Sequence, residues 1–474
     1  MVGIVSYGAH IPIYRLTREE IGRVWGTGGG KEEKAVANCD EDSLTMGVEA
    51  AVDCLQGVDR KSVDGLYFAS TTPPYKEKQS ASIIRAALDL NPNITTADFT
   101  DSLRAGTSAL RAAIDAVKAG SAEKVLVVSA DCRLPAPNSE FENLFGDGAA
   151  AFLIGSSEVA LNVEGSYTTS SEFIDVWRGQ GDPYPRTWED RFVSTHGYLE
   201  VMQKATLTIM KKYNLSPKDF VRAVFPSPDA RSHNTMARKL GFDYQNQVQD
   251  PMFNKMGNTG TAFGLMILAA TIEEAKTGEK ILFSNYGDGC DCYIFQVTDY
   301  VEKLMGRRGV KKNLSSKMYL SNYGKYLRFR NLMEWEPDRR PSEYSSLTTL
   351  WRDRKQILAL IGHKCKSCGK VQIDFPIQRV CAWCQSKDQF DEVRLSDKKG
   401  VLFSFSMDER TRDLDLPCVT AIVDIGEGAR FLTVMTDRDP QTLKVGMPVE
   451  FTFRKIHDGQ GLCNYFWKCR PVRD

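Results

Sequence analysis

Four cysteines in the last quarter of the 474-residue sequence have a spacing that suits metal binding. They form two CxxC pairs with twelve residues between them: Cys365, Cys368, Cys381 and Cys384. Thiolates spaced in this way supply the tetrahedral four-cysteine set that zinc takes in structural ribbons. His363 stands beside the first pair, but the two pairs already complete a four-coordinate site. The spacing therefore predicts a structural zinc ribbon with no open position for a substrate.

A second stretch that could support chemistry is TDSLRAGT, residues 100–107. An extended segment runs here into a helical pattern, because the apolar residues from Leu103 to Val117 recur at helix spacing. A buried helix start holds a nucleophile or a developing oxyanion well, since its free N–H groups and dipole favour negative charge. The residue at the central position of this stretch is Leu103, which has no reactive atom.

The elements that would position these residues alternate between strand and helix patterns. The runs 63–70 (VDGLYFAS) and 124–131 (KVLVVSAD) are apolar and bounded by turn residues, as in strands that are covered on both faces. Residues 42–55 have apolar side chains on one helical face, and 256–276 read as a loop that enters a long apolar helix. This alternation predicts an α/β layered fold with a mostly parallel or mixed sheet.

Composition and charge exclude several classes of protein. Lys+Arg and Asp+Glu are equal at 61 each, so nothing indicates nucleic acid or an anionic membrane as the main partner. The amino terminus, MVGIVSYGAHIP, lacks the pattern of a signal peptide, and no run of about 20 apolar residues occurs. We expect a soluble cytoplasmic protein with reduced cysteines.

Several sequence motifs resemble those of a known family. Residues 1 to about 300 resemble the 3-hydroxy-3-methylglutaryl-CoA synthases of the archaeal type, members of the thiolase superfamily. Residues 361–474 are similar to the zinc-ribbon plus OB-fold partner of acyl-CoA thiolases and synthases, here fused to the first part. The motifs are DEDS (40–43), TTPPYKEK (71–78), RAGTSAL (104–110), GDGAAAFLIG (146–155), DVWRGQGDPYPR (175–186), MGNTGTAFG (256–264) and NYGDG (285–289).

The resemblance implies a specific domain organisation. It implies a thiolase-like layered αβαβα fold followed by a rubredoxin-like zinc ribbon and an OB-fold β-barrel. We predict thiolase-like halves at 1–165 and 166–300, a connector at 301–360, the ribbon at 361–390 and the barrel at 391–474. The connector is basic and aromatic, which favours a solvated segment over one that binds the phosphates of coenzyme A.

The resemblance also implies catalytic positions, and this sequence departs from the family at each of them. Family members use a Cys that takes the acyl group, a Glu that moves protons and a His beside the thioester. The position of the Cys falls on Leu103, that of the Glu on Thr71 and that of the His on Pro226. None of these side chains can do the family's chemistry. Ser102 is a poor substitute nucleophile, because neighbouring helical side chains differ in direction by about 100° and the matching His is absent.

Two family positions do match, the Asn of the GN pair at Asn258 and the Tyr of THGY at Tyr198. A route without an acyl-enzyme would use Tyr198 and His196 as acid and base, and Asn258 as a donor to the thioester oxygen. For Tyr198, a structural tyrosine is an equally good interpretation, and for His196 a surface role is favoured. Asp229 is a weaker candidate for the base. Cys290 and Cys292 are interpreted as core residues.

Two functions from different classes follow from these residues. The first is cysteine-independent carbon–carbon bond cleavage or formation, of the aldol or retro-aldol type, on a 3-hydroxyacyl-CoA. The second is a catalytically inactive thiolase-like subunit that partners an active acyl-CoA thiolase or synthase. Both imply a coenzyme A thioester as ligand, and the resemblance implies a homodimer or tetramer.

Overall fold

The computed structural model describes residues 1–334, 336, 345–411 and 413–473, which form two compact units. Unit 1 comprises Met1–Ala37, Asp42–Ser82 and Asn91–Arg330, and unit 2 comprises Asn38–Glu41, Ile83–Leu90 and Asn331–Asp474. Residues 335 and 337–344 of the predicted connector lie outside the described residues, as do residues 412 and 474 of the predicted barrel. Within the described part of the chain, no helix is long and apolar enough to cross a membrane.

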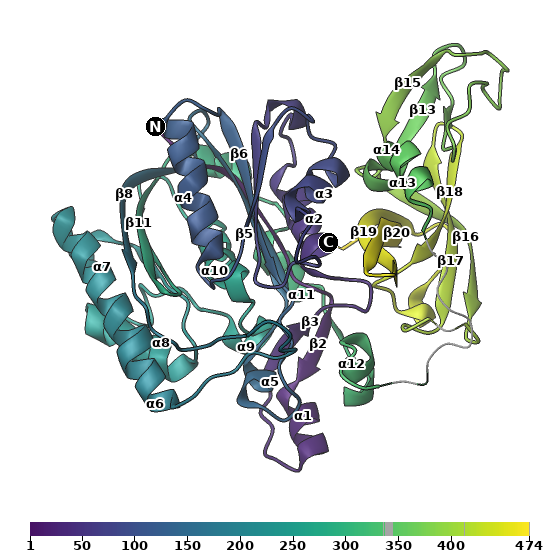
Figure 1. The fold of residues 1–474 in the computed structure, drawn as a ribbon. Coiled ribbons are helices and arrows are strands. Elements are labelled where there is room, and N and C mark those ends of the chain that lie inside the picture. Colours follow the sequence, from purple (N-terminus) through teal and green to yellow (C-terminus); the bar gives the residue numbers. More distant parts are fainter. Residues whose placement is uncertain (335, 337–344, 412, 474) are drawn as a thin grey trace. The chain divides into compact units, whose positions relative to one another are not determined.

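In its described residues, unit 1 is built on a nine-stranded mixed sheet with the order β5-β4-β6-β7-β1-β8-β11-β10-β9 (Figure 1). Strand β4 pairs in parallel with β5 and β6, whereas β6, β7, β1 and β8 are antiparallel neighbours. The mixed sheet confirms the predicted α/β class. The strands are β1 (Gly3–His10), β4 (Gly65–Ala69), β5 (Thr95–Phe99), β6 (Lys124–Asp131), β7 (Gly148–Gly155), β8 (Leu161–Ser170), β9 (Arg222–Val224), β10 (Lys280–Tyr286) and β11 (Gly289–Val297).

Two helices contribute to the apolar core of unit 1 (Figure 1). Helix α4 (Ala105–Lys118) is amphipathic, and its buried Leu110 and Ile114 share one apolar cluster with Val125 of β6. Helix α10 (Phe263–Ile272) is buried along its whole length, as expected for a helix that is apolar on all sides. Its sequence, FGLMILAATI, therefore belongs to the centre of the fold.

The other helices of unit 1 cover the sheet or carry loops to its edges. Asp42 caps α2 by accepting a hydrogen bond from the backbone N–H of Thr45 at 2.9 Å. The helices are α1 (Arg18–Trp25), α2 (Ser43–Cys54), α5 (Glu140–Leu144), α6 (Asp190–Phe192), α7 (Glu200–Lys212), α8 (Ala230–Leu240), α9 (Phe253–Met256), α11 (Gly309–Ser315) and α12 (Tyr323–Phe329), together with α3 (Ser80–Ala87), which spans the division between the units.

Residues 301–330 differ from the solvated segment that their charge predicts. Strand β12 (Met318–Tyr319) extends a small sheet with β2 (Tyr14–Thr17) and β3 (Glu33–Val36). Helix α12 buries Tyr323, Tyr326 and Phe329, which recur every three residues along one face. The aromatic residues of this stretch therefore decide its placement, because the basic residues between them can remain at the surface.

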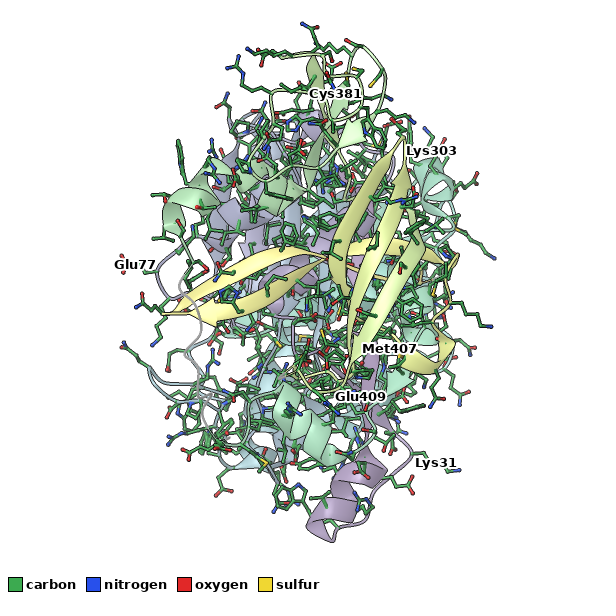
Figure 2. All side chains as sticks on the ribbon, turned by 90° about the vertical axis from the view of Figure 1, so that its right-hand side faces the viewer. Lys31, Glu77, Lys303, Cys381, Met407 and Glu409 are labelled. Carbon is green, nitrogen blue, oxygen red and sulfur yellow. The ribbon has the colours of Figure 1, made fainter. Side chains whose placement is uncertain are left out.

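Unit 2 combines a small three-stranded sheet with a closed barrel of the strand order β16-β17-β18-β20-β19. Along β17, Val419, Ala421 and Val423 are buried and alternate with less buried residues, as barrel strands require. Figure 2 shows Cys381 at one end of unit 2 and Met407 of β16 towards the other. The elements are α13 (Leu347–Arg352), α14 (Arg354–Ala359), β13 (Ile361–Cys365), β14 (Val371–Gln372), β15 (Phe390–Arg394), β16 (Gly400–Asp408), β17 (Cys418–Gly426), β18 (Ala429–Met435), β19 (Pro448–Gly459) and β20 (Leu462–Pro471).

Candidate active site

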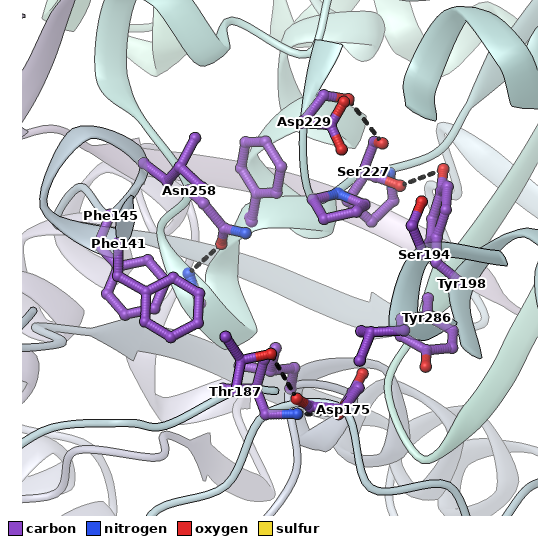
Figure 3. A pocket seen from close by; sticks show the side chains of 18 of the residues that line it. Phe141, Phe145, Asp175, Thr187, Ser194, Tyr198, Ser227, Asp229, Asn258 and Tyr286 are labelled. Carbon is purple, nitrogen blue, oxygen red and sulfur yellow. Dashed lines mark hydrogen bonds between the residues drawn. The ribbon is translucent and has the colours of Figure 1, made fainter. Parts of the chain in front are cut away.

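A largely apolar cavity of about 350 Å³ lies in unit 1 and brings together segments that are far apart in the sequence. Leu103, Tyr198, Pro226 and Asn258 all line it. Figure 3 shows Asn258 on one side of this cavity, and Tyr198 with Tyr286 on the other. The structure therefore unites four of the predicted positions around one space.

Leu103 lies at the cavity, but the helix that we expected to carry it begins later. Helix α4 starts at Ala105, and its first residues are held by Ser102, whose carbonyl accepts the N–H of Ala105 and whose hydroxyl accepts the N–H of Arg104. Such local bonds favour a turn over a further helical residue. The hydroxyl of Ser102 donates to the carboxylate of Asp288 at 2.6 Å, and Ser102 does not line the cavity.

Asn258 is fixed by its own backbone in a turn between glycines. Its N–H donates to the carbonyl of Leu144 at 2.7 Å, and its carbonyl accepts the N–H of Gly146 at 3.0 Å. A Cβ atom on Gly146 would lie 1.8 Å from the carbonyl oxygen of Met256, so only glycine permits this approach. The side-chain oxygen of Asn258 accepts the N–H of Gly260, which leaves its amide nitrogen as the donor available to a ligand.

Thr71 and Pro226, where the resemblance implies the family's Glu and His, both form hydrogen bonds within the protein. The hydroxyl of Thr71 donates to Asp131 at 2.9 Å, and the same buried carboxylate also accepts the backbone N–H of Thr71 and of Thr261. Thr71 does not line the cavity. The carbonyl of Pro226 accepts a hydrogen bond from Tyr198. Neither position offers an acid or a base to a ligand.

Tyr198 is buried, with 2% of its surface exposed, and its hydroxyl donates to the carbonyl of Pro226 at 3.0 Å. Burial raises the pKa of this phenol above its ordinary value. A hydroxyl whose one proton is already donated to the protein, and which resists ionisation, is poorly suited to move protons. This geometry fits the structural interpretation of Tyr198 better than the catalytic one.

His196 and Asp229 are also poorly suited to act as an acid or base on a ligand in the cavity. The side chain of His196 is 45% exposed, pairs with Glu200 at 2.9 Å and does not line the cavity. Asp229 lines the cavity, but its carboxylate caps α8 by accepting from the N–H and the hydroxyl of Ser232. Cys290 and Cys292 are fully buried, with sulfurs 3.5 Å apart, as core residues of one face of β11.

Asp175 is a cavity residue that the sequence did not single out. It lines the cavity in the loop between β8 and α6, and the hydroxyl of Tyr286 hydrogen-bonds to its carboxyl group. Burial is the largest influence on this carboxyl group and raises its pKa above the ordinary range. Asp175 opens the motif DVWRGQGDPYPR, yet nothing in the spacing of that motif distinguishes it from the other acidic residues there.

The four predicted zinc ligands lie together at the tip of the small sheet in unit 2. The sulfurs of Cys365 and Cys384 are 3.6 Å apart, and those of Cys368 and Cys381 are 3.7 Å apart. Zn–S bonds of about 2.3 Å place tetrahedral sulfurs about 3.8 Å from one another. All four sulfurs lie within 4.8 Å of one another, so the cluster is compatible with a zinc ribbon.

Comparisons with known proteins address both units. A family model described as 3-oxoacyl-[acyl-carrier-protein (ACP)] synthase III matches residues 97–171, and one described as the C-terminal OB-fold domain of ChsH2 matches 392–454. The hydroxymethylglutaryl-CoA synthase of Methanopyrus kandleri is 33% identical over 346 residues, which cover 70% of this chain and 98% of that protein. The chain belongs to the hydroxymethylglutaryl-CoA synthase family. The enzyme of Pyrococcus horikoshii is 37% identical over 324 residues, which cover 67% of this chain and 90% of that protein.

Solved structures of the hydroxymethylglutaryl-CoA synthase family have the same fold. A crystal structure of an HMG-CoA synthase complexed with CoA aligns with a TM-score of 0.63 at 18% identity, covering 73% of this chain and 95% of that one. The predicted thiolase-like fold, the OB-fold and the resemblance to this family are therefore confirmed.

Proposed function

We propose that the protein makes or breaks a carbon–carbon bond in a 3-hydroxyacyl-CoA by an aldol or retro-aldol reaction, without an acyl-enzyme. The observation that carries this proposal is the composition of the cavity. Leu103 lies at the family's nucleophile position, while a buried carboxyl group and an amide donor line the same space. The names of the relatives, and the CoA held by a similar solved structure, support a coenzyme A thioester as the ligand.

The proposed cleavage needs a base and an oxyanion donor. A base takes the proton of the substrate's 3-hydroxyl group, and the bond between C2 and C3 breaks. Its electron pair forms the enolate of the shortened acyl-CoA, and C3 leaves as an aldehyde or ketone. The enolate then takes a proton at C2. No protein nucleophile takes part, so an apolar residue at position 103 is compatible with every step.

The geometry favours Asp175 as the base and Asn258 as the oxyanion donor. A carboxyl group with a raised pKa is a stronger base than an ordinary aspartate, and Asp175 reaches the cavity directly. The amide nitrogen of Asn258 can donate to the enolate oxygen, and the turn that holds it reduces reorganisation during the reaction. Tyr198 and His196 are less favoured, since the first donates its proton to Pro226 and the second pairs with Glu200.

The second candidate is a catalytically inactive thiolase-like subunit that partners an active thiolase or synthase. It is supported by the loss of all three reactive side chains, at Leu103, Thr71 and Pro226. In either case we propose a structural Zn²⁺ at the four cysteines, where it would supply folding energy to the ribbon. The family resemblance also supports a homodimer or tetramer, which a measurement of mass in solution would test.

A panel of 3-hydroxyacyl-CoAs of different chain length and branching distinguishes the two candidates. The purified protein is incubated with each thioester, and the release of shortened acyl-CoA with an aldehyde or ketone is followed by mass spectrometry. The reverse condensation is assayed with the same products, and CoA binding is measured calorimetrically. Release or condensation supports the lyase. Binding of CoA with neither reaction contradicts it and leaves the inactive subunit, whereas absence of binding contradicts both.

A further inference from the structure

Arg133 presents a buried positive charge to the cavity. It follows β6 by two residues, only 6% of its surface is exposed, and it lines the same cavity as Leu103 and Asn258. Its guanidinium group lies over the ring of Phe145, 3.9 Å from the ring centre. Among the residues that the structure describes, no side chain or carbonyl group forms a hydrogen bond or an ion pair with this guanidinium.

An unpaired buried cation is costly, so its presence needs a physical reason. Removing a charged group from water is unfavourable unless another charge or hydrogen bonds compensate. Burial lowers the pKa of Arg133 to about 10, which still leaves the group charged near neutral pH. Arg330 shows the compensated case, because it pairs with Asp147 at 3.1 Å and donates to the carbonyl of Cys132. Arg133 has no such partner within the described part of the chain.

The cavity around Arg133 offers acids, but none of them is placed as its partner. Among the described lining residues Arg133 is the one cation, whereas Glu140, Asp175, Asp190 and Asp229 are acidic. Asp131, which lies outside the cavity lining, and to a smaller extent Asp175 favour the charged form of Arg133, yet neither forms an ion pair with it. The cationic group is therefore open to an anion that enters with a ligand.

We propose that Arg133 binds a carboxylate at the far end of the substrate's acyl chain, so that the protein selects CoA thioesters of dicarboxylic acids. This inference rests on the proposed function only in taking an acyl-CoA as the ligand. A guanidinium group matches a carboxylate by two parallel N–H···O bonds, and such charge-assisted pairs are the strongest hydrogen bonds in proteins. A volume of about 350 Å³ lies near the lower end for small-molecule sites, which favours a short acyl chain.

Asn258, which lines the same cavity, is a reason to assign Arg133 to the far end of the acyl chain rather than to the thioester group. The amide of Asn258 already supplies a donor for the thioester oxygen, which is neutral in the ground state. A neutral acyl tail in the cavity would displace water from Arg133 without replacing its hydrogen bonds. A carboxylate at that place satisfies the guanidinium and neutralises its charge.

Two non-reactive thioesters test this inference by isothermal titration calorimetry. Glutaryl-CoA carries the terminal carboxylate, and glutaramoyl-CoA replaces it with a primary amide of the same size. Neither has a 3-hydroxyl group, so neither can undergo the proposed cleavage. We expect the carboxylate ligand to bind about 10- to 100-fold more tightly than the amide. In Arg133→Met this preference is expected to vanish, because methionine keeps the length of the side chain but not its charge.

Two further variants separate the inference from its alternatives. Arg133→Lys is expected to retain part of the preference, and Arg111→Gln, which removes a cation from a surface ion pair on α4, is expected to leave it unchanged. If the two ligands bind equally to the wild-type protein, or weaken equally in Arg133→Met, then Arg133 serves the thioester or a coenzyme A phosphate and the inference is overturned. A carboxylate preference without cleavage of any 3-hydroxyacyl-CoA would overturn the proposed reaction and leave this inference standing.

Discussion

The four-cysteine cluster of unit 2 and the cavity of unit 1 differ in how their chemistry is built. In the cluster, all four side chains that would bind the metal come from 20 consecutive residues, 365–384. In the cavity, the side chains come from helices, strands and loops between Leu103 and Tyr286, and no two of the proposed groups are neighbours in the chain. The first site is local, whereas the second exists only after the sheet has formed.

This difference determines what each site tolerates. A tetrahedral site needs every ligand, since zinc leaves no ligand position spare in a four-cysteine set. The cavity has Leu103 and Pro226 at positions where the family resemblance implies a Cys and a His, and it also carries Asp175 and Arg133. On that correspondence, a scaffold that is fixed by buried strands and helices can exchange its reactive groups without losing the space between them.

The largest expected effect is the loss of a zinc ligand. Cys381→Ala is expected to remove the metal and unfold the ribbon, because zinc contributes about 10–16 kcal/mol to folding in small structural sites. Zinc content per chain and limited proteolysis would check both parts. Cys418→Ala is the control, since this cysteine lies in β17 outside the cluster and should leave zinc in place. Freshly prepared wild-type protein without metal would contradict the prediction.

The parts of the fold that depend on a local hydrophobic pattern were predictable from the sequence. The runs 63–70 and 124–131 are mostly apolar, and each contains a strand that is hydrogen-bonded within the large sheet. The region 301–330 was interpreted differently, because its charge is visible in the sequence while the burial of Tyr323 and Phe329 depends on tertiary packing. The start of α4 was placed too early, since the hydroxyl and carbonyl groups of Ser102 hold a turn that helix periodicity does not reveal.

Asp175→Asn should have the largest effect on turnover. If Asp175 is the base, the amide cannot accept the 3-hydroxyl proton, and kcat should fall by about 10²- to 10⁴-fold. Steady-state rates of acyl-CoA release would measure the loss. Asp229→Asn is a matched control, because it removes another cavity carboxylate while asparagine caps a helix as well as aspartate does. Equal losses in both variants would argue against a specific role for Asp175.

The pH dependence of turnover should reveal the same carboxyl group. Burial raises the pKa of Asp175, and the base must be ionised, so kcat/KM should increase with pH until the pH exceeds that raised pKa. The acidic limb should therefore lie above the value of about 3.9 that is typical of aspartate. A rate profile from pH 4 to 9 would show it. An acidic limb that persists unchanged in a residual activity of Asp175→Asn would assign it to another group.

The candidate site was only partly predictable, and the reason is chemical. Leu103, Pro226 and Asn258, three positions taken from the family resemblance, line the cavity, whereas Thr71, taken from the same resemblance, does not. Residue type alone could not show that Tyr198 has already donated its proton or that His196 lies outside the cavity lining. Hydrogen-bond partners and burial decide whether an ionisable side chain is available, and both depend on tertiary structure.

The smallest effect on turnover is expected for Tyr198→Phe. This variant distinguishes a structural role of Tyr198 from a catalytic one. The change leaves the carbonyl of Pro226 without its buried donor, which costs about 1–3 kcal/mol of unfolding free energy. Urea unfolding should show this loss, whereas kcat of the folded protein should change little, because the phenol is not the proposed acid or base. If kcat falls 100-fold while unfolding free energy is unchanged, Tyr198 moves the proton after all, and the wall that carries Asp175 serves binding alone.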